Sequence, residues 1–250
     1  VIRFLTGKKA ILRLRLSAMV PGRARIHKIV ALGTSGFVMQ FTNFLVQVVY
    51  NASLQQFGGD LYVGIMTVIN SVREIVSLPI SGLSGGSQPV IGYNYGARRY
   101  DRVKEAIRYT AIAGIVFTTV VWLLLLLFPE FFIRIFNRDP AVIAAGVPML
   151  RIYFAAFLTM SLQFAGQSTF VALGQARYAI FFSLFRKVIL VIPLALILPN
   201  ISGLGESGIF LSEPISDVIG GSASFITMLY VVRRLLAQEK ENKKTEAASY

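Results

Sequence analysis

Long uncharged stretches recur along the chain and alternate with short segments that carry most of the charges. They cover residues 29–59, 75–97, 109–129, 152–176 and 188–205, with a shorter one at 218–232. A membrane-spanning helix needs about 20 mainly apolar residues, and most of these stretches reach that scale. The pattern predicts helices at about 28–55, 61–96, 102–128, 140–173, 177–199 and 213–236. The predicted fold class is therefore all-α, a polytopic transmembrane helical bundle with six spans.

The composition supports a membrane protein and argues against an enzyme. Hydrophobic residues make up 55% of the chain, charged residues 15%, and the mean hydropathy is +0.65, whereas a soluble protein averages about a quarter charged residues. The chain has no cysteine, and its one histidine, His27, has no carboxylate cluster at metal-ligand spacing beside it. We therefore expect no catalytic residue, no metal and no cofactor.

The net charge of +13 could indicate either nucleic-acid binding or a membrane topology, and the placement of the basic residues distinguishes the two. Most of them fall on one side of the predicted spans, including Arg177, Arg186 and Lys187 near the inner turn, whereas Arg134 and Arg138 fall on the other side. This asymmetry follows the positive-inside rule and predicts a multi-pass protein of the bacterial plasma membrane, with both termini cytoplasmic and no nucleic-acid partner. The predicted organisation is a basic segment at 1–27, a six-helix lobe at 28–236 and a cytoplasmic tail at 237–250. The basic segment is either interfacial on the inner leaflet or a solvated linker.

Two boundaries carry helix-start signals. Asp139-Pro140 predicts an N-cap followed by proline at the first helical position, and Glu213-Pro214 predicts the same for the last helix. The first residues, Val1 to Leu5, are typical of the end of a further span, so we expect the chain to be part of a longer protein.

Small residues and prolines gather at the end of the second predicted helix. Gly82 with Gly86, and Gly92 with Gly96, lie one helical turn apart, which allows another helix to approach closely. Pro79 and Pro89 each remove an intrahelical hydrogen bond and predict a bent helix. Packing is the simpler role for these residues, and gating is the alternative.

The same segment resembles a known family. Leu78-Pro79-Ile80-Ser81-Gly82-Leu83-Ser84, Gln88 to Ala97 and Arg98-Arg99-Tyr100-Asp101-Arg102-Val103 are similar to the end of the eighth helix of MATE multidrug exporters, especially the MepA-like branch. Further matches are Leu173 to Arg177, Ile192-Pro193-Leu194 and Glu213 to Asp217, which resembles the start of the twelfth helix. The resemblance implies the C-terminal lobe, helices seven to twelve of twelve, and a missing N-terminal six-helix lobe as partner. It also implies secondary active efflux of lipophilic or cationic compounds in exchange for protons or sodium.

Some MATE members place an acid on the seventh and on the tenth helix for cation coupling, where this chain has Gln40, Asn43 and Gln163. That departure weakens a sodium site in this lobe. Two other functions stay open: a flippase for lipid-linked precursors, which would need several basic residues in its cavity, and a membrane scaffold without transport.

Polar residues inside the predicted spans form stripes at steps of three and four, and each stripe occupies one helix face. They include Gln40, Asn43 and Gln47 on the first helix, Asn70 on the second, and Gln163 and Gln167 on the fourth. We expect the three stripes to line an aqueous substrate cavity with Phe41 and Met160 in its walls, or to form hydrogen bonds between helices.

Three ionisable residues lie deep in the predicted spans: Arg73, Glu74 and Arg151. Neighbouring residues on a helix point about 100° apart, so Arg73 and Glu74 do not face each other. Glu74 and Arg151 lie at similar depth, and we expect them to form an ion pair. A structural tie is the favoured role for Glu74, and a proton carrier is the alternative.

Overall fold

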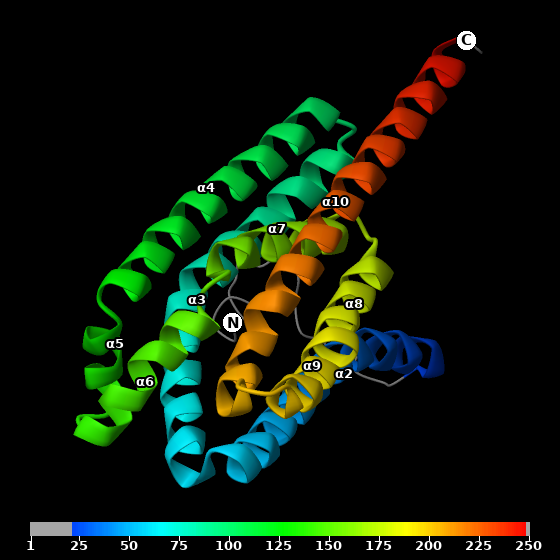
Figure 1. Ribbon diagram of the computed structural model, residues 1–250. Coiled ribbons are helices and arrows are strands. Elements are labelled where there is room, and N and C mark those ends of the chain that lie inside the picture. The colour runs from blue at the N-terminus through cyan, green and yellow to red at the C-terminus, as the bar shows by residue number, and fades with distance from the viewer. Residues whose placement is uncertain (1–21, 249–250) are drawn as a thin grey trace, which may run out of the picture. The chain divides into compact units, whose positions relative to one another are not determined.

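The protein is built from helices joined by short turns, and the computed structural model describes residues 22–248 (Figure 1). The predicted basic segment 1–27 therefore lies almost wholly outside the described residues. The chain divides into two units, residues 1–40 and 41–250, and the packing discussed below concerns the second. No strand occurs among the described residues, and the all-α prediction is confirmed.

The elements in chain order are α2 (Arg23–Phe57), α3 (Gly59–Gly96), α4 (Tyr100–Leu127), α5 (Pro129–Phe136), α6 (Pro140–Tyr153), the 3-10 turn η2 (Phe157–Thr159), α7 (Met160–Ala172), α8 (Ala176–Leu184), the π-helical segment η3 (Phe185–Val191), α9 (Ile192–Ile197), the 3-10 turn η4 (Leu198–Asn200) and α10 (Gly205–Ala248).

Among the described residues, four helical segments are long and apolar enough to cross a membrane: α3, α4, residues 176–200 and the part of α10 up to residue 237. The bent pair of α6 and α7 supplies a fifth if it counts as one span. The helix α2 is 35 residues long, which is enough for a span, and it covers the first predicted span, 28–55. The polytopic membrane fold is confirmed, and the expected number of six spans is approximate.

The helix predicted at 140–173 is interrupted. It consists of α6 and α7, which meet at 45°, with 3-10 hydrogen bonds between them. The break leaves backbone carbonyls without helical partners, and side chains of α4 approach two of them: Trp122 Nε1 donates to Ala155 O at 3.1 Å, and Thr118 Oγ1 lies 3.4 Å from Leu158 O. A broken helix is tolerated in a membrane when neighbouring helices satisfy its backbone in this way.

The last helix begins earlier than predicted, at Gly205 rather than at Glu213. Glu213 is therefore no N-cap, and Pro214 lies inside the helix. The added turns pack tightly, because a Cβ on Gly208 would lie 2.7 Å from the carbonyl carbon of Leu198. The helix also continues past the predicted boundary at residue 236 as far as Ala248.

The prolines of α3 behave as expected, but its glycines do not. Figure 1 shows that α3 changes direction along its length, and Pro79 and Pro89 both lie inside it. A Cβ on Gly82, Gly86 or Gly96 would meet nothing within 4 Å, because these positions lie on an exposed face of α3. Of the predicted packing glycines, only Gly92 has a close neighbour, the carbonyl oxygen of Ala172 at 3.2 Å from the added Cβ.

Close helix packing occurs instead between α7 and α10. A Cβ on Gly166 would lie 2.9 Å from Ser224 Oγ, and one on Gly221 would lie 2.9 Å from the carbonyl oxygen of Thr159. These two glycines let the helix backbones approach, as small residues do in membrane bundles. The contact fixes α10 against the polar stripe that includes Gln163, whose Cβ lies 3.9 Å from the position of a Cβ on Gly221.

Candidate functional site

A buried network of four charged side chains joins three elements. Arg73 comes from α3, Arg186 from η3, and Glu213 and Asp217 from α10. Glu213 and Asp217 are four residues apart and therefore share one face of the helix. Arg186 Nη1 donates to Glu213 Oε1 at 2.8 Å and to Asp217 Oδ1 at 2.7 Å, and Arg73 forms an ion pair with Glu213. Two cations thus balance two anions.

Burial makes this balance necessary. The side chains of Glu213 and Asp217 are only 3% and 4% exposed, that of Arg186 is 8% exposed, and Arg73 is the most accessible at 19%. An unpaired charge in such an environment is costly, and breaking one buried pair leaves its partner uncompensated. The network therefore ties α3, η3 and α10 to one another, and loss of any single member affects all three elements.

Tyrosine hydroxyls extend the network on both sides. Tyr50 of α2 donates its hydroxyl hydrogen to Glu213 Oε2 at 2.8 Å, and its oxygen lies 3.0 Å from Ser212 Oγ. Tyr153 of α6 accepts from Arg73 Nη1 at 2.7 Å, and the Arg73 guanidinium carbon lies 5.5 Å from the centre of the Tyr153 ring. These bonds connect α2 and α6 to the three elements of the ion network.

A chain of hydrogen bonds leads from the buried ions to an exposed face. Tyr153 donates to Asn70 Oδ1 at 3.3 Å, and Asn70 Nδ2 donates to Gln47 Oε1 at 3.3 Å. The side chain of Gln47 is exposed, so the chain Glu213, Arg73, Tyr153, Asn70 and Gln47 runs from the interior to the surface of α2 and α3. A change at this surface can therefore reach the buried charges through direct contacts.

The local backbone places Arg186 at the network. It lies in the π-helical turn η3, which leads into α9, where Pro193 is the second residue and has no N–H to donate to the carbonyl four residues earlier. Such turns often occur at functional sites. Gly220 on α10 provides the space, because a Cβ there would lie 2.8 Å from Arg186 Cγ. The Arg186 Nε atom is buried and makes no hydrogen bond.

A second polar contact links η3 to α2. Lys187 Nζ donates to Asn43 Oδ1, and Asn43 has an exposed side chain on the same helix as Gln47. Arg186 and Lys187 were counted with the basic residues of the cytoplasmic side, and both lie inside the helix predicted at 177–199, which agrees with the continuous helical segment 176–200. Their positions bring a half-buried lysine to the polar face of α2.

The predicted ion pair between Glu74 and Arg151 is wrong. Both side chains are exposed, and neither takes part in an ion pair of the described residues. Arg73 and Glu74 point in different directions, as predicted, but it is Arg73 that turns inward, to Glu213. Its partner Glu213 was missed because the Glu-Pro sequence imitates a helix start. The four-residue spacing of Glu213 and Asp217 in a segment rich in small residues was the available signal.

The polar stripes divide into two groups. Asn43, Gln47 and Asn70 meet in the contacts just described, whereas Gln163 and Met160 are buried within the bundle. Met160 Sδ accepts from Ser77 Oγ at 3.9 Å, and the half-buried Gln167 has an Nε2 atom without a partner. Gln40 and Phe41 have exposed side chains on α2.

The residues described by the structure contain no group of three His, Cys, Asp or Glu side chains that could hold a metal ion. The carboxylates of the network are instead matched by arginine. Guanidinium groups occupy carboxylate oxygen atoms that a bound cation would need, so the arrangement favours charge pairing over cation coordination.

Comparisons with known proteins agree on one fold. The family model described as MatE matches residues 36–197. A FAD transporter from Shewanella oneidensis is 25% identical over 215 residues, which cover 85% of this chain and 46% of that protein. The chain spans about half the length of this relative.

Solved structures give the same picture. A MATE crystal structure in the bent conformation has a TM-score of 0.85 at 17% identity, covering 95% of this chain and 53% of that one. A MOP superfamily transporter from Pyrococcus furiosus, described as having a binding pocket of reverse polarity, has a TM-score of 0.82 at 17% identity, with coverage of 95% and 53%. An outward-facing multidrug resistance MATE transporter has a TM-score of 0.81 at 16% identity, with coverage of 96% and 52%.

Proposed function

We propose, because this chain belongs to the MatE family, that it forms one lobe of a secondary active transporter in the plasma membrane. The chain is a multi-pass membrane protein, so the lipid bilayer is its surroundings. The proposed activity is export of lipophilic or cationic organic compounds in exchange for protons or sodium ions. The proposed partner is a second six-helix lobe, because transporters with repeated bundles move one bundle against the other around a shared site. An excess of Lys and Arg on one side supports cytoplasmic termini.

The observation that carries this proposal is the polar face of α2 and α3 formed by the exposed Asn43 and Gln47 and the half-buried Asn70. Polar side chains facing hydrocarbon cost free energy unless water or protein satisfies them. In this chain Gln47 and Asn70 form a hydrogen bond with each other, and the side chains of Asn43 and Gln47 remain exposed. It is therefore suited to one wall of a water-filled pathway that the second lobe closes.

The ion network supports a lobe that moves as a unit. Arg73, Arg186, Glu213 and Asp217 join three elements that are far apart in the sequence, and Tyr50 and Tyr153 add two more. We assign the network the role of holding these helices together during alternating access.

A flavin nucleotide is the second candidate substrate. It is favoured by the FAD transporter similar to this chain and by the half-buried Lys187 beside Asn43. A lysine on the pathway wall attracts an anion and repels a lipophilic cation. The two candidates therefore predict opposite effects of removing this charge.

Transport by membrane vesicles tests the proposal. Everted membrane vesicles are prepared from cells that express the protein from its native gene, and a pH or sodium gradient is imposed across them. Uptake of a fluorescent cationic dye or of FAD is then measured. We expect gradient-dependent movement that Gln47→Leu reduces and that Gln55→Leu, an exposed position of the same helix, leaves intact. Equal transport by both variants would contradict the assigned pathway face, and movement of FAD without the dye would support the second candidate.

A further inference from the structure

The short helix α5 lies at the end of α4, beside the first half of α6 (Figure 1). It buries Pro129 and Ile133 and exposes large apolar side chains, with Phe131 62% and Ile135 58% exposed. A helix with one apolar side open to the surroundings and arginines at its end is typical of the boundary between lipid headgroups and acyl chains. The position of α5 at the end of a spanning helix places it at that boundary.

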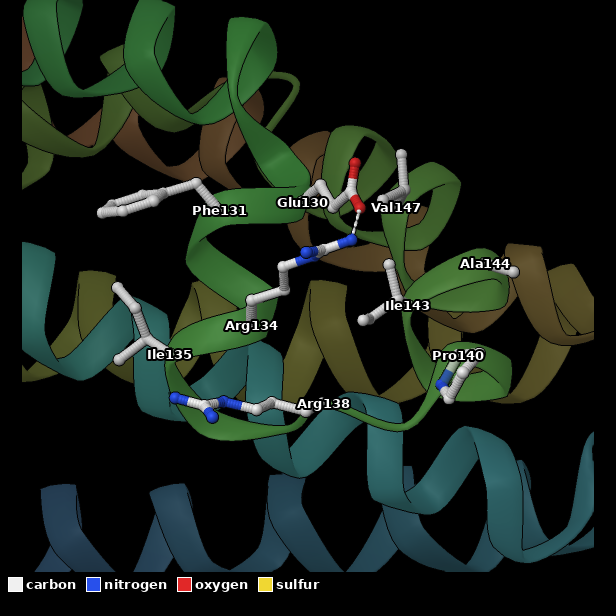
Figure 2. Close-up of a pocket in the computed structure, with 9 residues that line it drawn as sticks. All are labelled: Glu130, Phe131, Arg134, Ile135, Arg138, Pro140, Ile143, Ala144 and Val147. Atoms are coloured by element: carbon white, nitrogen blue, oxygen red, sulfur yellow. Dashed lines mark hydrogen bonds and ion pairs between the residues drawn. The ribbon is translucent and has the colours of Figure 1, made fainter.

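An open cavity of about 950 Å³ lies between α5 and α6. Figure 2 shows that its lining comes from α5, the following loop and the first half of α6. Apolar walls are formed by Phe131, Ile135, Ile143 and Val147. The volume is at the upper end of the range of small-molecule sites, about 300–1,000 Å³.

The charges of the cavity leave a cationic group available. Arg134 Nη2 and Glu130 Oε1 form an ion pair at 2.5 Å, which neutralises both (Figure 2). Arg138 also lines the cavity, and within residues 22–248 no acidic side chain is paired with it. The nearby Asp139 accepts from the backbone N–H of Ala141 at 2.9 Å and caps α6. The cavity lining thus carries one more positive than negative charge.

We propose that this cavity binds an anionic phospholipid of the leaflet at the α5 end of the bundle, with its phosphate on Arg138 and an acyl chain along the apolar walls. A guanidinium group binds phosphate oxygens through paired hydrogen bonds. The apolar walls match an acyl chain, which a small soluble anion lacks. The charge, the walls and the interfacial position of α5 together select an amphiphilic anion, and the bilayer supplies it next to the cavity.

Native mass spectrometry of the purified full chain tests the proposal with equal amounts of phosphatidylglycerol and phosphatidylcholine. Arg138→Gln removes the proposed phosphate ligand. Ala144→Trp fills the cavity without changing charge, because Ala144 lines it. Arg108→Gln is the matched control, since Arg108 is an exposed arginine on α4 at a distance in sequence from α5. Melting temperatures of all variants show whether each is folded.

The unchanged chain should retain phosphatidylglycerol in preference to phosphatidylcholine. Arg138→Gln should weaken this retention about tenfold, as expected for one charge-assisted contact. Ala144→Trp should weaken the retention of both lipids, and Arg108→Gln should change neither. Equal retention of the two lipids, displacement by inorganic phosphate at the concentration of the lipid, or an equal loss in Arg108→Gln and Arg138→Gln would each overturn the proposal.

Discussion

Replacement of Glu213 by Gln should strongly destabilise the fold, because this one side chain has three partners. Its carboxylate is 3% exposed and contacts Arg73, Arg186 and Tyr50. Glutamine keeps one acceptor oxygen, but its amide NH2 replaces the other oxygen, so either the arginines or the Tyr50 hydroxyl would face a donor in place of an acceptor. The variant leaves two arginines against Asp217 alone. Breaking a buried ion pair costs about 3–5 kcal/mol in free energy of unfolding.

Thermal unfolding of the purified chain measures this effect. A chain of this size loses about 2–4 °C in Tm for each kcal/mol, so Glu213→Gln should lower Tm by about 6–20 °C. The control is Glu74→Gln, the same chemical change at an exposed glutamate that has no ion pair within residues 22–248, and it should shift Tm by no more than about 2 °C. The double variant Arg73→Gln with Glu213→Gln restores the charge balance. Its decrease in Tm should therefore be smaller than the sum of the decreases in the two single variants. Equal Tm values for Glu213→Gln and Glu74→Gln would refute the network.

Three further outcomes are expected. Tyr153→Phe removes a buried hydroxyl with two partners and should cost about 1–3 kcal/mol in chemical unfolding, whereas Tyr109→Phe at an exposed tyrosine should be neutral. Gly221→Ala should lower the free energy of unfolding in the same measurement, because its Cβ would lie 2.9 Å from a backbone oxygen. Gly82→Ala, where nothing lies within 4 Å of the added Cβ, should be neutral or stabilising. A larger loss of stability in Gly82→Ala than in Gly221→Ala would contradict the packing of α7 against α10. In vesicle transport, Lys187→Gln should raise uptake of a cationic dye and lower uptake of FAD, and no change in either would remove this lysine from the pathway.

The regular parts of the fold follow from local sequence. The charge-free stretches of α3 and α4 are long enough to cross a membrane, and the type and approximate bounds of both helices were predicted correctly. The break between α6 and α7 depends on contacts from Trp122 and Thr118, which lie on another helix and leave no mark in the broken segment itself. The start of α10 was misplaced because a local cap signal at Glu213 competed with tertiary packing at Gly208, and packing prevailed.

The site was predictable only in part. Helical spacing placed Gln47 on a polar face of α2 and Asn70 on a polar face of α3, and in the structure the two side chains form a hydrogen bond. The choice between Arg73 and Glu74 as the inward residue depends on the rotation of α3 against its neighbours. Arg186 was not predicted as a site residue because the charge-free stretch begins after it and its charge was counted with the basic residues of the cytoplasmic side, and the π-helical turn that carries it has no clear sequence signal.

Cysteine accessibility tests the pathway face most directly, because the chain has no native cysteine to interfere. Single variants Gln47→Cys and Ile112→Cys, the latter an exposed apolar position on α4, are treated in intact membranes with a hydrophilic thiol reagent. A water-filled pathway along α2 and α3 predicts rapid labelling of Gln47→Cys that transported substrate slows, and little labelling of Ile112→Cys. Labelling of Ile112→Cys as fast as that of Gln47→Cys, or labelling of Gln47→Cys that substrate does not change, would contradict the assignment of this face to transport.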